Sequence, residues 1–271
     1  MDLVFKNSES SGFDLELSLD LPLSDFTIGS QTSLTLSPNT SKTITVRYAP
    51  TQNTSSKAIE VSHNSSIRAN PTKIQLSGIK DISSSISTLT DEGWALFSSK
   101  DYIQSRKKFQ EAIVASFVSS IYDSISNEAK LGRAWATIFA QESPDFAMTS
   151  YIDFDFLKPN SVKLSSKSKK DAWAGLSISG VLLNSQGADT YSSNVVSTAV
   201  YLLESSPNYE FSYNTKINYK DVRYALIQAY YNLSDYVNAA SQLDILDPVN
   251  APHSATPEGL LIAIQALGGQ L

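Results

Sequence analysis

The chain has 271 residues, which is enough for two domains of ordinary size, and it carries 21 Lys and Arg against 27 Asp and Glu, a formal net charge of -6 at pH 7. Because phosphate binding depends on clustered cations, this balance argues against nucleic acid as a partner. The chain has no cysteine, which excludes disulfides, cysteine–zinc sites and thiol catalysis.

Residues 1–80 are expected to form short β-strands joined by turns. Leu15, Leu17 and Leu19 alternate with polar residues, and Ile44 and Val46 do so again in a later stretch. Alternation with a period of two predicts strands that bury one face. Short strands separated by regular turn signals predict an antiparallel β-sandwich.

The same region resembles a known family in three stretches: residues 36–50, 58–64 and 74–78. Together they resemble the immunoglobulin-like modules of the ASH/HYDIN/choice-of-anchor-D group, over residues 2–79. The resemblance implies an immunoglobulin-like β-sandwich over residues 1–80. The family's leading strand is not found before Leu3, which leaves two expectations open. Either the native chain extends upstream, or another segment fills the groove.

Residues 81–90 are rich in Ser and Thr and are expected to link the two halves of the chain. Thr90 is followed by Asp91 and Glu92, a pattern typical of a helix N-cap with acids in the first turn. The first helix is therefore expected to begin after Thr90.

Residues 91–271 show an aromatic residue at a nearly constant interval. Tyr102, Phe146, Tyr191 and Tyr236 are separated by 44, 45 and 45 residues. A fixed period of this size predicts an array of helix pairs, in which each repeat buries its apolar face against its neighbours. We expect about four helix pairs with a period of about 45 residues.

The first of these units resembles a tetratricopeptide repeat: Gly93 occupies the small position of the first helix, and Tyr102 begins the second, with Phe109 and Ala112 behind it. The similarity, over roughly residues 88–271, is to tetratricopeptide-like repeat lipoproteins of bacterial envelopes. It implies an α-solenoid after the sandwich, hence a multidomain β + α fold. It also implies a periplasmic, outer-membrane-associated or extracellular location, with any export signal or lipid anchor outside this sequence. The weakly charged composition, with 18% charged residues, is common in exported proteins.

No catalytic, cofactor or metal site is expected, and the chain is interpreted as not an enzyme. His63 and His253 lie too far apart in the sequence to suggest a cluster or a relay. Asp153 and Asp155 lack the further oxygen ligands and the glycine of a calcium loop, and they are interpreted as part of an exposed turn. The basic stretch at residues 163–170 is interpreted as a solvated loop. No apolar run approaches the roughly 20 residues that cross a bilayer.

The candidate binding feature is a concentration of aromatic residues before and within the last helix pair: Tyr209, Phe211, Tyr213, Tyr219 and Tyr224. Exposed Tyr rings could hold a peptide or stack on a sugar, because they bring a large contact area at low entropic cost. The alternative is that these rings pack a long inter-helix loop onto the helices. A core role is expected for the three tryptophans: Trp94, Trp135 and Trp173.

These features favour three functions from different classes. The first is a non-enzymatic protein–protein interaction scaffold of the cell envelope, which binds a partner segment on the face of the helical array. The second is a structural subunit of an extracellular or envelope assembly, in which an incomplete sandwich accepts a strand from a neighbour and the protein self-associates. The third is a glycan-binding lipoprotein that uses the aromatic stretch as its platform.

Overall fold

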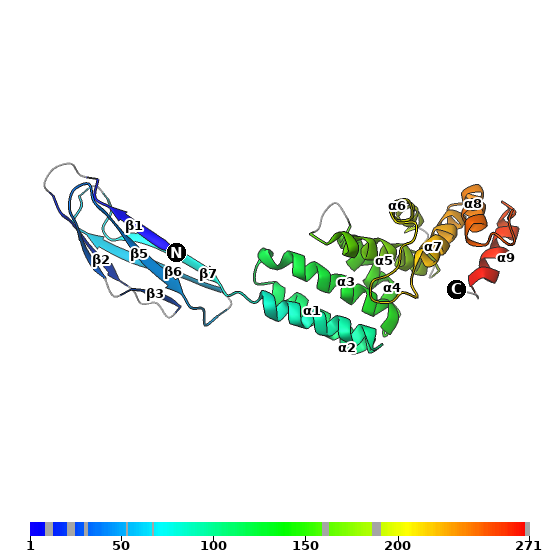
Figure 1. Cartoon of the computed structure of the whole chain (residues 1–271), viewed down its shortest axis with the longest axis horizontal. Helices are drawn as coiled ribbons and strands as arrows, with labels where there is room; N and C mark the ends of the chain where they lie inside the picture. The colour runs from blue at the N-terminus through cyan, green and yellow to red at the C-terminus, as the bar shows by residue number, and fades with distance from the viewer. Residues whose placement is uncertain are drawn as a thin grey trace. The chain divides into compact units, whose positions relative to one another are not determined.

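The computed structural model describes residues 1–8, 13–20, 25–29, 32–52, 54–66, 68–158, 163–185 and 191–268. The chain divides into two compact units, Met1–Ile82 and Ser83–Leu271, and Figure 1 shows strands in the first and helices in the second.

The first unit contains two antiparallel sheets. Its described strands are β1 (Asp2–Lys6), β2 (Leu15–Asp20), β3 (Phe26–Ile28), β4 (Ser33–Leu36), β5 (Ser41–Tyr48), β6 (Thr54–His63) and β7 (Thr72–Ile79). One sheet has the order β1-β5-β3 and the other β4-β2-β6-β7. The register of the longest pairing aligns Ile59 of β6 with Ile74 of β7.

The two sheets share one hydrophobic core. Leu17 and Leu19 of β2 are buried together with Ile44 and Val46 of β5, and Ile59 of β6 is fully buried at its centre. The polar residues between them face outward, so the alternation expected for β2 and β5 is confirmed.

The second unit is helical. Its described helices are α1 (Ser83–Ser98), α2 (Tyr102–Ser116), the 3-10 helix η1 (Ser120–Tyr122), α3 (Asp123–Ala140), α4 (Phe146–Phe156), α5 (Ser166–Ser185), α6 (Ser192–Ser205), α7 (Tyr219–Asn232), α8 (Tyr236–Leu246) and α9 (Pro257–Gly268). From α1 to α9 each helix packs against the next one along the chain. Each odd-numbered helix also packs against the next odd-numbered helix. The odd-numbered helices therefore form one row, and each even-numbered helix lies against two of its members.

The regular aromatic spacing marks the beginning of each even-numbered helix. Tyr102, Phe146 and Tyr236 are the first residues of α2, α4 and α8, and Tyr191 is the N-cap of α6. The expectation that Tyr102 begins a helix is therefore confirmed. Tyr102 shows why an aromatic residue suits this position: its ring stacks on Phe139 of α3, with centroids 4.9 Å apart.

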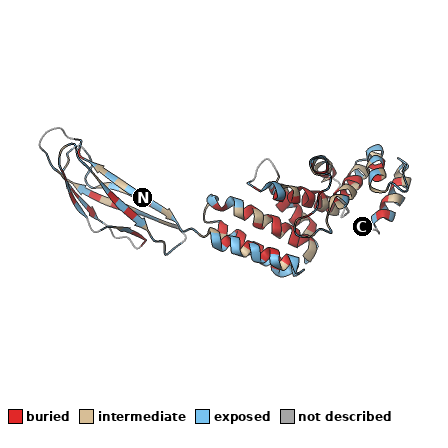
Figure 2. Cartoon of the chain, viewed as in Figure 1, coloured by how far each residue is buried: buried red, intermediate tan, exposed pale blue. Residues whose placement is uncertain are grey.

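Glycines let the helices approach one another around two phenylalanines. Phe109 of α2 contacts Gly93 of α1 and Gly132 of α3, and a Cβ at Gly132 would lie 2.2 Å from its ring. Phe154 of α4 stands in the same relation to Gly175 of α5, also at 2.2 Å. A side chain larger than hydrogen at these positions would force the helices apart. Figure 2 shows buried residues on the facing sides of neighbouring helices and exposed residues on their outer sides.

The expected linker over residues 81–90 is wrong for most of its length, because α1 begins at Ser83. Thr90 is not an N-cap. It is buried inside α1, and its hydroxyl donates to the carbonyl oxygen of Ile86 at 2.9 Å. A hydroxyl that bonds to the carbonyl four residues earlier is compatible with a helix interior. Ile86 and Thr90 also continue the buried face of Trp94, which composition alone does not reveal.

Two further interpretations are corrected by the helix boundaries. Residues 166–170 of the basic stretch form the first turn and more of α5, not a loop. Asp153 lies inside α4 and is buried, not part of an exposed turn. Its carboxylate accepts two hydrogen bonds from Arg133 of α3, at 2.8 and 2.6 Å, which explains how a charged group is accommodated there.

Every helix in the described ranges is too short or too polar to span a membrane.

Candidate functional site

The connection between α6 and α7, residues 206–218, forms a small hairpin that lies on the row of odd-numbered helices; we call it the hairpin loop. Its two arms meet where Glu210 pairs with Asn218. The N–H of Phe211 donates to the carbonyl oxygen of Ile217 at 2.9 Å, and the N–H of Tyr219 donates to that of Tyr209 at 2.8 Å. These bonds satisfy the loop's own backbone and hold its first arm extended.

Three alternating aromatic residues of this arm contact three successive odd-numbered helices. The Tyr209 hydroxyl donates to Asp171 of α5 at 3.0 Å. The Phe211 ring stacks on Trp135 of α3, with centroids 4.2 Å apart. The Tyr213 ring lies parallel to Trp94 of α1, with centroids 3.5 Å apart. The hairpin loop is therefore anchored at three points along the row.

Burial separates the aromatic residues that the sequence suggests as partner contacts. Tyr209 and Phe211 are 4% and 0% exposed, so their predicted role in contacting a partner is wrong for this structure. They pack the inter-helix loop onto the helices, because each ring gains a buried surface of the same chain there. Tyr213 is 39% exposed and Tyr219 is half-buried, so both keep accessible surface. The Tyr224 hydroxyl donates to the carbonyl oxygen of Ile264, which ties α7 to α9.

The expected core role of the tryptophans is confirmed, since all three are buried: Trp94, Trp135 and Trp173.

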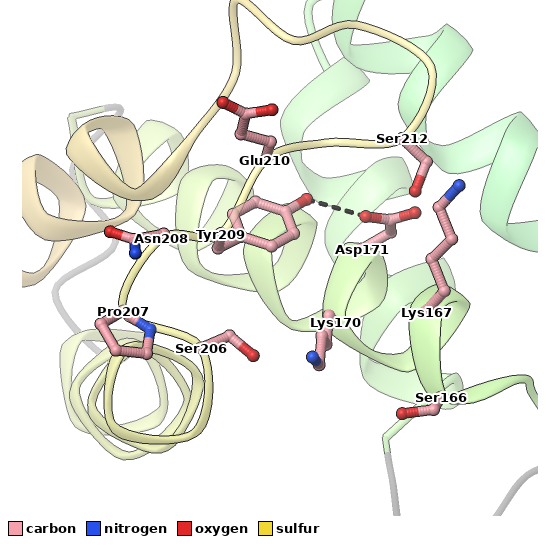
Figure 3. A pocket seen from close by; sticks show the side chains of 10 residues that line it. All are labelled: Ser166, Lys167, Lys170, Asp171, Ser206, Pro207, Asn208, Tyr209, Glu210 and Ser212. Atoms are coloured by element: carbon pink, nitrogen blue, oxygen red, sulfur yellow. Dashed lines mark hydrogen bonds between the residues drawn. The ribbon is translucent and has the colours of Figure 1, made fainter.

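A cavity of about 550 Å³ lies beside the hairpin loop, between the loop and the beginning of α5 (Figure 3). The end of α6 completes its wall. The lining residues come from two short stretches: Ser166, Lys167, Lys170 and Asp171 on one side, and Ser206, Pro207, Asn208, Tyr209, Glu210 and Ser212 on the other.

Asp171 forms the buried end of this cavity. The residue is 2% exposed, and its carboxylate accepts a hydrogen bond from the Tyr209 hydroxyl at 3.0 Å. Ser212 and the charge of Lys167 also favour its ionised form. Figure 3 shows the Ser212 hydroxyl facing the same carboxylate. Burial raises the pKa of Asp171 from 3.8 to about 6, because the charged form loses its hydration there. Burial likewise raises the pKa of Tyr209, and the neighbouring Asp171 adds to the effect.

The remaining charges of the cavity come from Lys167 and Lys170 of α5 and from Glu210 of the hairpin loop. No ion pair joins any of these groups, or Asp171, to another described residue. The Ser206 hydroxyl oxygen is buried and has no hydrogen-bond partner among the described residues. Buried polar groups are usually satisfied, so this hydroxyl has bonding capacity to spare.

Asp171 was not among the candidate residues expected from the sequence. The signal available was a single acid at the start of an apolar helical stretch, Asp171-Ala172-Trp173-Ala174-Gly175-Leu176. That signal alone does not predict a buried carboxylate, because an acid near a helix N-terminus is ordinarily exposed and interacts with the helix dipole.

A second surface feature lies on the even-numbered helices. Each of them exposes a large apolar side chain near its C-terminal end, and these residues are Val114, Phe156, Tyr201 and Ile245, 54%, 53%, 56% and 58% exposed. In the described parts of α1, α3, α5 and α7 no large hydrophobic side chain is exposed. We call the four residues the apolar stripe.

Comparison of the chain with family models, with curated proteins and with solved structures finds no match. Within the described residues, no three His, Asp or Glu side chains gather in an arrangement that could hold a metal ion.

Proposed function

We propose that this chain is a non-enzymatic protein–protein interaction scaffold of the cell envelope, periplasmic, outer-membrane-associated or extracellular, and that it binds a partner segment on its helical unit. In this proposal the first unit is an immunoglobulin-like β-sandwich of the ASH/HYDIN/choice-of-anchor-D type, which acts as a spacer or docking module. The second unit is a tetratricopeptide-like solenoid. Two antiparallel sheets around one core and a row of paired helices support this assignment.

The observation that carries the proposal is the repetition of the apolar stripe. Val114, Phe156, Tyr201 and Ile245 follow one another at intervals of 42, 45 and 44 residues, close to the period of the helix pairs. Positions that recur at about this interval lie on successive even-numbered helices, so one partner segment could contact several of them along the array. A row of exposed apolar side chains is the kind of surface that binds an extended or helical segment of another protein.

Neighbouring side chains hold two of the four residues of the apolar stripe in place. The Lys130 ammonium lies over the Phe156 ring, 4.1 Å from its centroid. The Tyr201 ring packs edge-on against Trp173, with centroids 4.5 Å apart. Rings that are already fixed lose less conformational entropy on binding, which favours affinity. The burial of Tyr209 and Phe211 moves the proposed partner surface away from the hairpin loop and onto this stripe.

Site-specific photocrosslinking in cells tests the scaffold. A benzophenone amino acid at position 201 or 245 is expected to give a discrete adduct with a partner protein, whereas the same residue at the exposed position of Lys107 on α2 gives none. Phe156→Ser is expected to weaken the adduct formed from position 245. Equal labelling from all three positions, or a Phe156→Ser variant that labels as well as the native protein, would contradict a specific partner surface.

A structural subunit is the second candidate, because β7 is an eight-residue strand at the edge of its sheet. An edge strand offers backbone groups to a strand from a neighbouring molecule. Light scattering on the size-exclusion eluate separates the candidates. A constant mass near 29.5 kDa at all concentrations favours the scaffold, and a mass that rises with concentration favours self-assembly.

A further inference from the structure

Strand β5 of the first unit is paired along most of its length on one side but only at its end on the other. On its β1 side the register covers Ser41 to Thr45, whereas on its β3 side the described pairing runs only from Val46 to Tyr48. Residues 41–45 therefore form an open sheet edge, which we call the β5 edge.

The alternation of hydrogen bonds shows which backbone groups of the β5 edge are free. Val46 and Met1 exchange two backbone hydrogen bonds, at 2.8 and 3.1 Å. In an antiparallel pair the hydrogen-bonded positions alternate, so the even-numbered residues of β5 bond to β1 and the odd-numbered residues point away from it. The N–H and C=O groups of Thr43 and Thr45 thus face the β3 side, where no described residue forms a hydrogen bond with them.

A cavity of about 490 Å³ lies where β3 ends beside the β5 edge. Its lining comes from both strands: Thr27, Ile28 and Gly29 at the end of β3, and Thr43, Ile44, Thr45 and Arg47 of β5. A Cβ at Gly29 would meet nothing within 4 Å beyond its chain neighbours, so the space past the end of β3 is open. An extended segment has room to lie there beside β5.

The side chains at the β5 edge define the composition that an added strand needs. Ile44 is buried in the core and Ile28 packs against that core, whereas Thr43 and Thr45 are exposed. A strand beside them would meet apolar surface on one face and hydroxyl groups and water on the other, with a period of two. Arg47 lines the cavity without an ion-pair partner among the described residues, which favours an acidic residue on the outer face.

We propose that the β5 edge binds an extended segment of a partner protein as an added strand, antiparallel to β5 and in line with β3. Antiparallel pairing is the commoner arrangement and is also that of β3 itself. The segment pairs with the free backbone groups of Thr43 and Thr45 and directs apolar residues toward Ile28 and Ile44. A second copy of this chain fits less well, because its described strands are already held in sheets, which would meet the end of β3.

Amide hydrogen exchange of the full chain, followed by NMR, tests whether the β5 edge is free. The N–H groups of Thr43 and Thr45 are expected to exchange at least about tenfold faster than that of Ile44, which the register pairs with Leu3 of β1. Equal protection of the three N–H groups would overturn the proposal, because the edge would then already be covered.

The probe for binding is the peptide acetyl-Glu-Val-Thr-Val-Glu-Val-amide, in which valines alternate with polar residues. It is expected to slow exchange at Thr43 and Thr45. In an antiparallel pair the polar residues of the probe lie opposite these two threonines, so N-methylation of the polar residues should weaken binding at least about tenfold and N-methylation of the valines should not. The absence of protection at millimolar probe, or equal binding by the two methylated peptides, would overturn the proposal.

Variants assign the binding to the β5 edge. Thr43→Pro removes an N–H that faces the added strand and should abolish binding, and proline is tolerated at an unpaired sheet edge. Arg47→Glu should reverse the preference for the probe over a form with Lys in place of Glu. Arg68→Glu is the matched control, since Arg68 is exposed and does not line the cavity. Thermal unfolding verifies that each variant is folded. A folded Thr43→Pro variant that binds like the native chain, or an Arg47→Glu variant with unchanged preference, would overturn the assignment.

Discussion

Replacement of Asp171 by asparagine is expected to make the helical unit more stable at neutral pH. The substitution removes a buried charge that Lys167 offsets only in part, and it keeps an oxygen that accepts the Tyr209 hydroxyl. The amide group added by asparagine faces Ser212, whose hydroxyl can accept its hydrogen bond but whose backbone N–H loses the carboxylate charge, so the gain is smaller than the full cost of the charge. The shape of the side chain barely changes, so packing costs are small.

The size of the expected gain in stability follows from the pKa of Asp171. Folding raises the pKa of Asp171 from 3.8 to about 6, and each unit of pKa difference corresponds to about 1.4 kcal/mol, so the ionised carboxylate costs about 3 kcal/mol. Between these two pKa values the folded state binds more protons than the unfolded state. Stability therefore decreases as pH rises from about 4 to about 6, and the full cost is present above that range.

Thermal unfolding followed by circular dichroism at a helical wavelength measures the effect. For a unit of this size, a gain of about 2 to 3 kcal/mol raises Tm by roughly 5 to 10 °C at pH 7.5. The gain should shrink toward zero at pH 4, where the native carboxyl group is neutral. An Asp171→Asn variant that is less stable than the native chain at pH 7.5, or a difference in stability that does not change with pH, would contradict a cost from the ionised Asp171.

Three further predictions concern buried rings, a close contact between helices and a helix cap. Phe211→Ala should lower the free energy of unfolding by about 3 to 5 kcal/mol, because the ring is fully buried against Trp135. Tyr213→Ala should lower it by less, because Tyr213 is 39% exposed. Equal losses for the two variants in denaturant titrations would contradict the packing of the hairpin loop on the helices. Gly132→Ala should destabilise by about 1 to 3 kcal/mol through its clash with Phe109, whereas Gly29→Ala, with nothing within 4 Å of the new methyl group, should have no such steric cost. Asp101→Ala should cost about 1 kcal/mol by removing the acceptor for the Gln104 N–H at the start of α2, and an unchanged Tm would show that this cap is dispensable.

The repeat length and the alternation of the strands could be read from the sequence, because both depend on local periodicity. Tyr102, Phe146, Tyr191 and Tyr236, whose interval predicted helix pairs, lie at or directly before the first residues of the even-numbered helices. A residue near a helix start meets the same kind of neighbour in every repeat, so the pattern recurs in the chain itself. The start of α1 was mistaken because composition suggested a linker, while the buried spacing of Ile86, Thr90 and Trp94 specified a helix.

The site depended on contacts between residues far apart in the sequence. The sequence pattern of an extended arm with aromatic residues at positions 209, 211 and 213 is the same whether the rings face solvent or pack on a row of helices. Their burial was decided by Trp94, Trp135 and Asp171, which the fold brings beneath the hairpin loop from three different helices. Asp171 acquires its raised pKa only when that loop covers it, because burial is a property of the folded chain. Local spacing thus determined the elements and their repeat, whereas tertiary packing alone decided which aromatic rings are buried and where an unpaired charge faces a cavity.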